Sequence, residues 1–292
     1  ATVTIGALTA VARSTTVARE VVSAGAFGTA DVLDAYLIAY AIPVYLLGAV
    51  AGSFQSAFVP RYIALRQDQG DGAADRLAGD SLAAMLLGLG AVTLILAAVA
   101  RLLLPVIAVS FGPAKTELAL RLLYVMVPAV FLGAVPIVYS AWLNALERFR
   151  VPALLPGVGP LIAVAALIAL GPRFGIYALA GGTVAGAAVE VLVVAAAARA
   201  AGHRLPLPGL KGTADLAAVA REFWPLLLGT LLFSSTTLVD QIMAASLLPG
   251  SIAALGFGSR VTALVIAVAG VGVATSVLPA FSRLVADRDW PT

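Results

Sequence analysis

The sequence predicts an all-α protein whose helices cross a membrane several times. Of its 292 residues, 61% are hydrophobic and 11% are charged, and the mean hydropathy is +1.04. A soluble globular domain carries about 25% charged residues, so this chain has too few charges to cover a water-facing surface. Uninterrupted apolar stretches also recur along the chain, at about the length of 20 residues that a spanning helix needs. Together these observations exclude a soluble enzyme, a nucleic-acid-binding protein and a disordered chain.

Eight stretches qualify as candidate spans. They lie at about 3–26, 32–60, 79–108, 118–145, 151–171, 174–198, 218–247 and 252–285. Helices are expected at all eight, because lipid cannot satisfy the exposed backbone groups of an open strand. A membrane β-barrel would instead show alternating strands of about ten residues, and the sequence contains none.

The breaks between the spans are defined by turn chemistry. Taken in chain order, Gly28 and Asp31 separate the first two spans, and the sequence Gln-Gly-Asp-Gly at 69–72 separates the second from the third. Gly171-Pro172-Arg173 separates the fifth from the sixth, and Leu-Pro-Gly-Ser at 248–251 separates the last two. Glycine and proline at these places end helices and favour turns.

The distribution of basic residues predicts the orientation in the membrane. With the N-terminus in the cytoplasm, eleven Lys and Arg residues fall in inner loops and four fall in outer loops. The inner set is Arg61, Arg66, Arg76, Arg148, Arg150, Arg199, Arg204, Lys211, Arg221, Arg283 and Arg288, and the outer set is Arg101, Lys115, Arg121 and Arg173. Because basic residues accumulate on the cytoplasmic side, this orientation is the predicted one.

The spans are expected to form two lobes. Residues 1–200 make an N-terminal lobe of six helices, residues 201–217 a cytoplasmic linker, and residues 218–292 the start of a C-terminal lobe. The hairpin around 244–255 echoes the hairpin around 24–36, and such internal repeats are common in transporters. The alternative is that two short helical hairpins resemble each other by chance. Since the chain lacks an initial Met and ends in a polar segment, the fold is expected to be truncated after about eight helices.

Charged residues inside the spans are the candidate functional residues. An ionisable group at the centre of a spanning helix costs about 2.5–3.5 kcal/mol and usually faces a cavity or the bundle interior. The first span carries Arg13 and Arg19, with Glu20 placed to neutralise one of them. Further along the chain, Asp34, Asp240 and Arg260 occupy the second, seventh and eighth spans. The alternative interpretations are that Arg19, Glu20 and Asp34 reach the interface, and that Asp240 pairs with Arg260.

The functional interpretation is a cavity for an anionic substrate. Arginine forks match phosphate and carboxylate groups, so phosphate esters or pyrophosphates are the natural ligands of Arg13, Arg19 and Arg260. There is no Cys and only one His, so thiolate and His-rich metal sites are excluded, and no cofactor is expected. No nucleotide-binding loop or catalytic grouping is present either, which predicts a transporter and not an enzyme.

Four segments carry a family resemblance. They are FGTADVLDAYLIAYAIP at 27–43 with SAFVP at 56–60, LNALERF at 143–149, the stretch from Val239 through AASLLPGSIAAL at 244–255 to Arg260, and LPAFS at 278–282. In this order they resemble the MurJ/MviN family of lipid II flippases, within the superfamily of multidrug, oligosaccharidyl-lipid and polysaccharide exporters. The resemblance covers nearly the whole chain.

The resemblance implies a function and a set of site residues. It implies alternating access across the bacterial inner membrane, with lipid II, a polyprenyl-pyrophosphate-linked peptidoglycan precursor, as the substrate. It places Arg13, Arg19, Asp34 and Arg260 on the residues that line the family's cationic central cavity. Asp240 is the residue we would assign to ion coupling. Membrane lipids and proteins of cell-wall synthesis are the further partners implied.

One departure from the family pattern keeps two alternatives open. Family members commonly carry a basic pair shortly after the proline of the second helix, whereas residues 43–53 of this chain carry no charge. The protein could then be a flippase for another polyprenyl-linked oligosaccharide, or a transport-inactive membrane scaffold for cell-wall enzymes.

Overall fold

The computed structural model describes residues 2–28, 31–108, 111–200, 209, 214–245 and 247, and a few positions between 251 and 262. These residues fold into long helices, and no strand occurs among them. The helices are α1 (Thr2–Phe27), α2 (Asp31–Gln69), α3 (Asp71–Ile107), α4 (Pro113–Met126), α5 (Pro128–Leu132), α6 (Ala134–Ala145), α7 (Arg150–Leu154), the 3₁₀ turn η1 (Leu155–Gly157), α8 (Val158–Phe174), α9 (Ile176–Ala200) and α10 (Ala214–Ala245).

The helices confirm the predicted membrane architecture. Within the described residues, six helical segments are long and apolar enough to cross a membrane. The helix α1 has 26 residues and therefore a length of about 39 Å, which is long enough to cross a bilayer, but with three charges it is not one of these six segments. Seven of the eight predicted spans thus coincide with helices. The eighth, at 252–285, lies almost wholly outside the described residues.

The fifth span ends later than predicted. We expected a break at Gly171-Pro172-Arg173, but α8 continues through Pro172 to Phe174. The turn is made by Gly175, which has φ +57°, a left-handed conformation that glycine adopts without steric cost.

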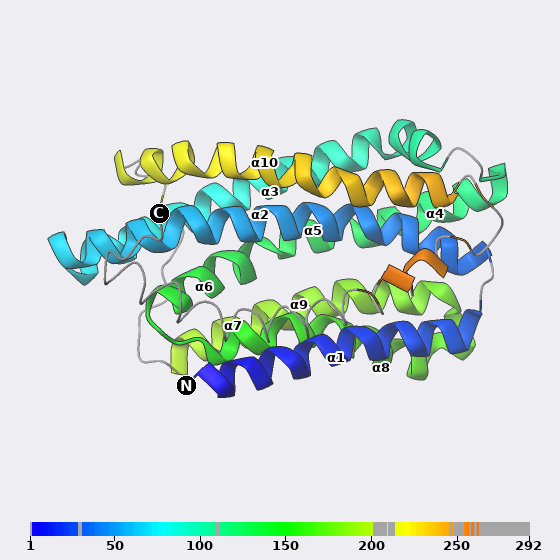
Figure 1. The fold of residues 1–292 in the computed structure, drawn as a ribbon, viewed down its shortest axis with the longest axis horizontal. Helices are drawn as coiled ribbons and strands as arrows, with labels where there is room; N and C mark the ends of the chain where they lie inside the picture. The colour runs from blue at the N-terminus through cyan, green and yellow to red at the C-terminus, as the bar shows by residue number, and fades with distance from the viewer. Residues whose placement is uncertain are drawn as a thin grey trace, which may run out of the picture.

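Two sets of helices lie on either side of the broken helix α4–α6 (Figure 1). On one side α2 packs against α3 and α10, and on the other side α8 packs against α9 and α1. The segments α4, α5 and α6 contact both α2 and α9, so they join the two sides. Pro128 has no backbone N–H to donate, and the helix is interrupted there and again at Gly133.

Glycines allow α8 and α9 to approach each other closely. A Cβ atom at Gly186 would lie 2.8 Å from both Cα and O of Gly159, so the two backbones are in direct contact. One turn further along α9, Oε1 of Glu190 accepts a hydrogen bond of 3.1 Å from the backbone N–H of Gly159. Glu190 therefore satisfies one of the backbone donors that the first turn of α8 leaves without a helical partner.

The turn after α6 is closed by a non-glycine residue in a left-handed conformation. Glu147 has φ +59°, its N–H donates to the carbonyl of Asn144 at 3.0 Å, and the N–H of Arg148 donates to the carbonyl of Leu143 at 2.8 Å. This pair of bonds is a Schellman motif, whose left-handed position is usually glycine. An L-residue pays about 1–2 kcal/mol for this conformation.

Replacing Glu147 with glycine is therefore expected to stabilise the protein by about 0.5–1 kcal/mol, since the steric cost is removed and only part of it is offset by a more flexible unfolded chain. Glu147→Val is the matched variant, because a β-branched residue tolerates a positive φ least, and it is expected to lower the melting temperature. Thermal unfolding of the purified protein checks both. A lower melting temperature for Glu147→Gly would show that the Glu147 side chain itself stabilises the turn.

Candidate functional site

Arg19 lies inside the bundle where α1 faces α2. Only 3% of the residue is exposed, and its Cζ atom lies 4.2 Å from the ring centroid of Tyr40. The Nη2 atom of Arg19 lies 3.6 Å from Oε1 of Glu20, which is also buried. Both side chains are enclosed by protein, so the alternative in which they reach the membrane interface is wrong. The predicted neutralisation of an arginine by Glu20 is confirmed.

Two tyrosines of α2 extend this arrangement to a third helix. The rings of Tyr36 and Tyr40 stack with their centroids 5.5 Å apart, and the Tyr36 hydroxyl shares a hydrogen bond of 3.2 Å with Oγ1 of Thr183 on α9. We call Arg19, Glu20, Tyr36, Tyr40 and Thr183 the arginine–tyrosine cluster. It holds α1, α2 and α9 together through polar contacts in a region otherwise packed with aliphatic side chains. Hydropathy predicted the two charges but not the tyrosines, although the spacing of four residues between Tyr36 and Tyr40 places them on one helix face.

Asp34 is buried at the start of α2 and paired with a lysine. Its Oδ2 atom lies 3.1 Å from Nζ of Lys115 at the start of α4, and Lys115 also binds Asp31 at 2.7 Å. The ammonium group of Lys115 lies 4.2 Å from the ring centroid of Phe111. In the sequence Lys115 looks like an ordinary cation of an outer loop. The signal it missed is that two carboxylates in the first turn of one helix attract a cation from a neighbouring helix start.

Arg13 lies on a different face of α1 from Arg19. The packed face of α1 carries Ala12, which is 3% exposed, and Thr15, whose hydroxyl donates a hydrogen bond of 3.0 Å to the carbonyl of Gly157. Arg13 itself is exposed, and among the described residues it has no ion pair or side-chain hydrogen bond. At about 17 Å from the start of a helix about 39 Å long, it lies near the middle of α1.

The remaining predicted residues are not brought into this arrangement. Asp240 is exposed near the end of α10, and Arg260 lies outside the described residues. Their predicted pairing therefore stays a prediction. No group of three or more His, Asp or Glu side chains suited to a metal ion occurs among the residues that the structure describes.

The charged residues of α1 fall into two groups, one buried and paired and the other exposed. One is the buried arginine–tyrosine cluster, in which Arg19 is compensated by Glu20. The other is Arg13, an uncompensated cation on the exposed face of α1. A guanidinium group cannot face lipid in the middle of a spanning helix without a large cost, so Arg13 is suited to a water-filled cavity that takes an anion.

The chain is similar in sequence to known proteins of one family. The family model described as lipid II flippase MurJ matches residues 23–292. A curated relative from Synechocystis sp., named probable lipid II flippase MurJ, is 28% identical over 300 residues, which cover 94% of this chain and 53% of the relative. The chain spans a little over half the length of the curated relatives it matches.

Solved structures share the fold. The structure of a lipid II flippase MurJ in an inward closed conformation matches 97% of this chain and 59% of its own, with a TM-score of 0.79 and 23% identity. An outward-facing multidrug resistance transporter of the MATE family, in the MOP superfamily, matches 90% of this chain and 60% of its own, with a TM-score of 0.69 and 18% identity. The predicted fold, a polytopic helix bundle of the MATE-like type, is thereby confirmed.

Proposed function

Because the chain belongs to the lipid II flippase MurJ family, we propose that the protein moves lipid II across the bacterial inner membrane by alternating access. No covalent bond of the substrate is made or broken, so the protein acts as a transporter. The proposed path runs along the exposed face of α1, which carries Arg13 and otherwise mostly small residues.

The observation that carries the proposal is the uncompensated Arg13. A cation in the middle of a spanning helix, with no counter-ion among the residues that the structure describes, is retained where it contacts water and an anionic ligand. The pyrophosphate of a polyprenyl-linked head group carries the required charge, and its oxygens match the planar guanidinium fork. Arg13 is thus the residue of α1 that contacts the substrate directly.

Arg19 contributes a second cation once Glu20 is displaced. In the closed cluster its guanidinium lies between Glu20 and the Tyr40 ring, so an incoming pyrophosphate competes with a single carboxylate. A pyrophosphate carries more negative charge than one carboxylate, which favours the exchange. Arg260 is proposed as a third cation, from the part of the chain beyond α10.

Asp34 and Asp240 have supporting parts in the proposal. Asp34 holds Lys115 beside the start of α2 and so positions a further cation at this end of the bundle. Asp240 is proposed to couple transport to a cation gradient.

The proposed organisation has an N-terminal lobe at 1–200, a linker at 201–217 and the start of a C-terminal lobe at 218–292. The N-terminus is proposed to lie in the cytoplasm. Proteins of cell-wall synthesis are the proposed partners.

Complementation tests the function and the role of Arg13 separately. The full-length protein is produced in bacteria depleted of their own lipid II flippase, beside Arg13→Ala and the matched variant Arg121→Ala. Arg121 is also an exposed arginine, and its pair with Glu117 lies at the surface, where such pairs contribute little to stability. Rescue is expected for the unchanged protein and Arg121→Ala, and loss of rescue for Arg13→Ala at equal membrane abundance.

The two possible failures are distinguishable. Absence of rescue by the correctly inserted unchanged protein contradicts lipid II transport. Rescue by all three proteins supports transport but removes Arg13 from the substrate path.

A further inference from the structure

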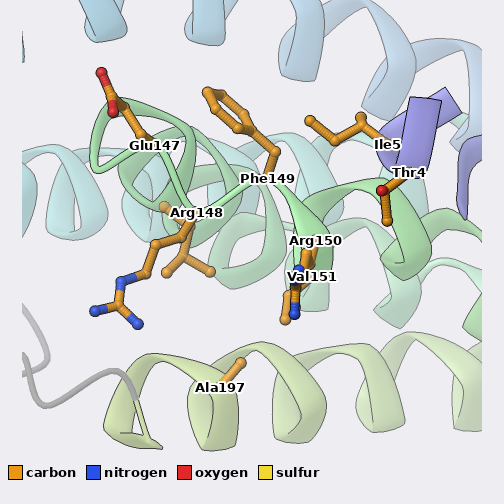
Figure 2. A pocket seen from close by; sticks show the side chains of 9 residues that line it. Thr4, Ile5, Glu147, Arg148, Phe149, Arg150, Val151 and Ala197 are labelled. Carbon is orange, nitrogen blue, oxygen red and sulfur yellow. The ribbon is translucent and has the colours of Figure 1, made fainter. Parts of the chain in front are cut away.

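A cavity opens at the end of the bundle where α1 begins. It has a volume of about 630 Å³ and lies between the first turns of α1, the turn that joins α6 to α7, and the last turns of α9 (Figure 2). Its walls include the apolar side chains of Ile5, Phe149 and Val151 and the basic side chains of Arg148 and Arg150. None of these residues belongs to the proposed substrate path along Arg13.

Among the residues that the structure describes, the two arginines have no counter-ion. Both are exposed, and in the part of the chain that the structure describes neither forms an ion pair or a side-chain hydrogen bond. Figure 2 shows the guanidinium groups of Arg148 and Arg150 extending toward the side on which α9 carries Ala197. The carboxylate of Glu147 points to the opposite side of the turn. Glu147 also lines the cavity, but two arginines against one carboxylate leave the cavity with a net positive charge.

The backbone holds the two arginines in fixed positions. The N–H of Arg148 is bound to the carbonyl of Leu143, and the carbonyl of Phe149 accepts the N–H of Ala153 at 3.0 Å. The left-handed Glu147 reverses the chain between these bonds, so that Arg148 leaves the end of α6 while Arg150 begins α7. Arg148 and Arg150 are thus carried by a hydrogen-bonded turn and not by a long open loop. The backbone therefore loses less conformational entropy when a ligand binds.

The position of the cavity indicates the source of its ligand. It lies where three helices end, and the same end of the bundle carries Arg61, Arg66, Arg76, Arg199 and Arg221. By the distribution of basic residues this is the cytoplasmic end, where the bilayer is rich in anionic lipids. Basic pockets between membrane helices on this side are suited to lipid phosphate groups. The exposed Phe149 ring adds the aromatic surface typical of the membrane interface.

We propose that this cavity binds the phosphate group of an anionic phospholipid from the cytoplasmic leaflet. Arg148 and Arg150 bind the phosphate oxygens, while Ile5 and Phe149 contact the glycerol and the upper part of the acyl chains. A bound lipid connects the start of α1 to the start of α7 and the end of α9. The site is independent of the transported substrate, so it stands whether or not the protein moves lipid II.

Lipid titration followed by native mass spectrometry tests the site. The purified full-length protein, stripped of lipid in detergent, is titrated with phosphatidylglycerol, and the dissociation constant of the tightest-bound molecule is measured. The double variant Arg148→Gln/Arg150→Gln is expected to raise this constant by roughly 30-fold, as each basic residue near a lipid surface contributes about a fivefold factor. The matched control Arg76→Gln/Arg221→Gln removes two cations from the same end outside the cavity, and is expected to change it less than about threefold.

Three results would overturn the proposal. The first is unchanged affinity in the cavity variant, and the second is an equal loss of affinity in the control. The third is displacement of the lipid by inorganic phosphate at the same concentration, which would make free phosphate the ligand.

Ile5→Glu tests the site if the double arginine variant does not fold, because it adds a negative charge to the cavity wall and leaves the turn intact. It is expected to lose phosphatidylglycerol binding that the neutral Ile5→Gln retains, and equal binding by the two contradicts the site.

Discussion

Arg19→Ala is expected to abolish complementation and to destabilise the protein by about 3–5 kcal/mol, the cost of removing one partner from a buried ion pair. The substitution leaves Glu20 buried without its cation and removes the group that lies over the Tyr40 ring. Growth of flippase-depleted bacteria measures the loss of complementation, and thermal unfolding in detergent measures the loss of stability.

A second variant separates binding from stability. In Arg19→Ala/Glu20→Gln the uncompensated charge is gone, so most of the lost stability is expected to return. If Arg19 binds the pyrophosphate of the substrate, this stable double variant still fails to complement. Restored growth would instead show that Arg19 has only a structural role in the arginine–tyrosine cluster.

Gly186→Ala is expected to lower the melting temperature by about 4–8 °C. Its Cβ atom would lie 2.8 Å from backbone atoms of Gly159, which cannot move without separating α8 from α9. Overpacking of this kind costs about 1–3 kcal/mol, and a loss of about 2 kcal/mol corresponds to this shift for a chain of this size class. Separation of the helices also lengthens the hydrogen bond between Gly159 and Glu190.

Gly181 provides the matched control on the same helix. A Cβ atom at Gly181 meets nothing within 4 Å, so Gly181→Ala is expected to leave the melting temperature unchanged or to raise it slightly, since alanine favours the helix. Equal melting temperatures for the two variants would mean that α8 and α9 can separate without cost.

Much of the fold was predictable from the sequence, because the bilayer imposes a simple length rule. Apolar stretches of about 20 residues predicted seven of the helices, and the helical hairpins at Gly28 and Gly70 were located from turn residues. The interruptions at Pro128 and Gly133 were not predicted. Proline alone does not decide whether a helix breaks, as Pro43 and Pro60 lie inside the continuous α2.

The site was predictable only as a set of charges. Hydropathy identifies Arg19 and Asp34 as costly residues, but their partners depend on which helices become neighbours. Tyr40 and Lys115 reach these charges from other helices, and Lys115 lies 81 residues away from Asp34 in the sequence. The cavity beside Arg148 depends on the left-handed Glu147, a conformation that the sequence pattern of a glutamate does not signal.

Lys115 joins α4 to the start of α2 through two ion pairs, and these pairs differ in their exposure to solvent. We call this contact the joint between α2 and α4. The side chain of Asp31 is 62% exposed, whereas that of Asp34 is 3% exposed. The screening length of dissolved ions is about 8 Å at physiological ionic strength and shortens as salt rises, and screening weakens exposed ion pairs more than buried ones. In the proposed orientation this joint faces the medium outside the cytoplasm. As the salinity of that medium rises, the contact with Asp31 weakens while the contact with Asp34 persists, and the joint stays closed.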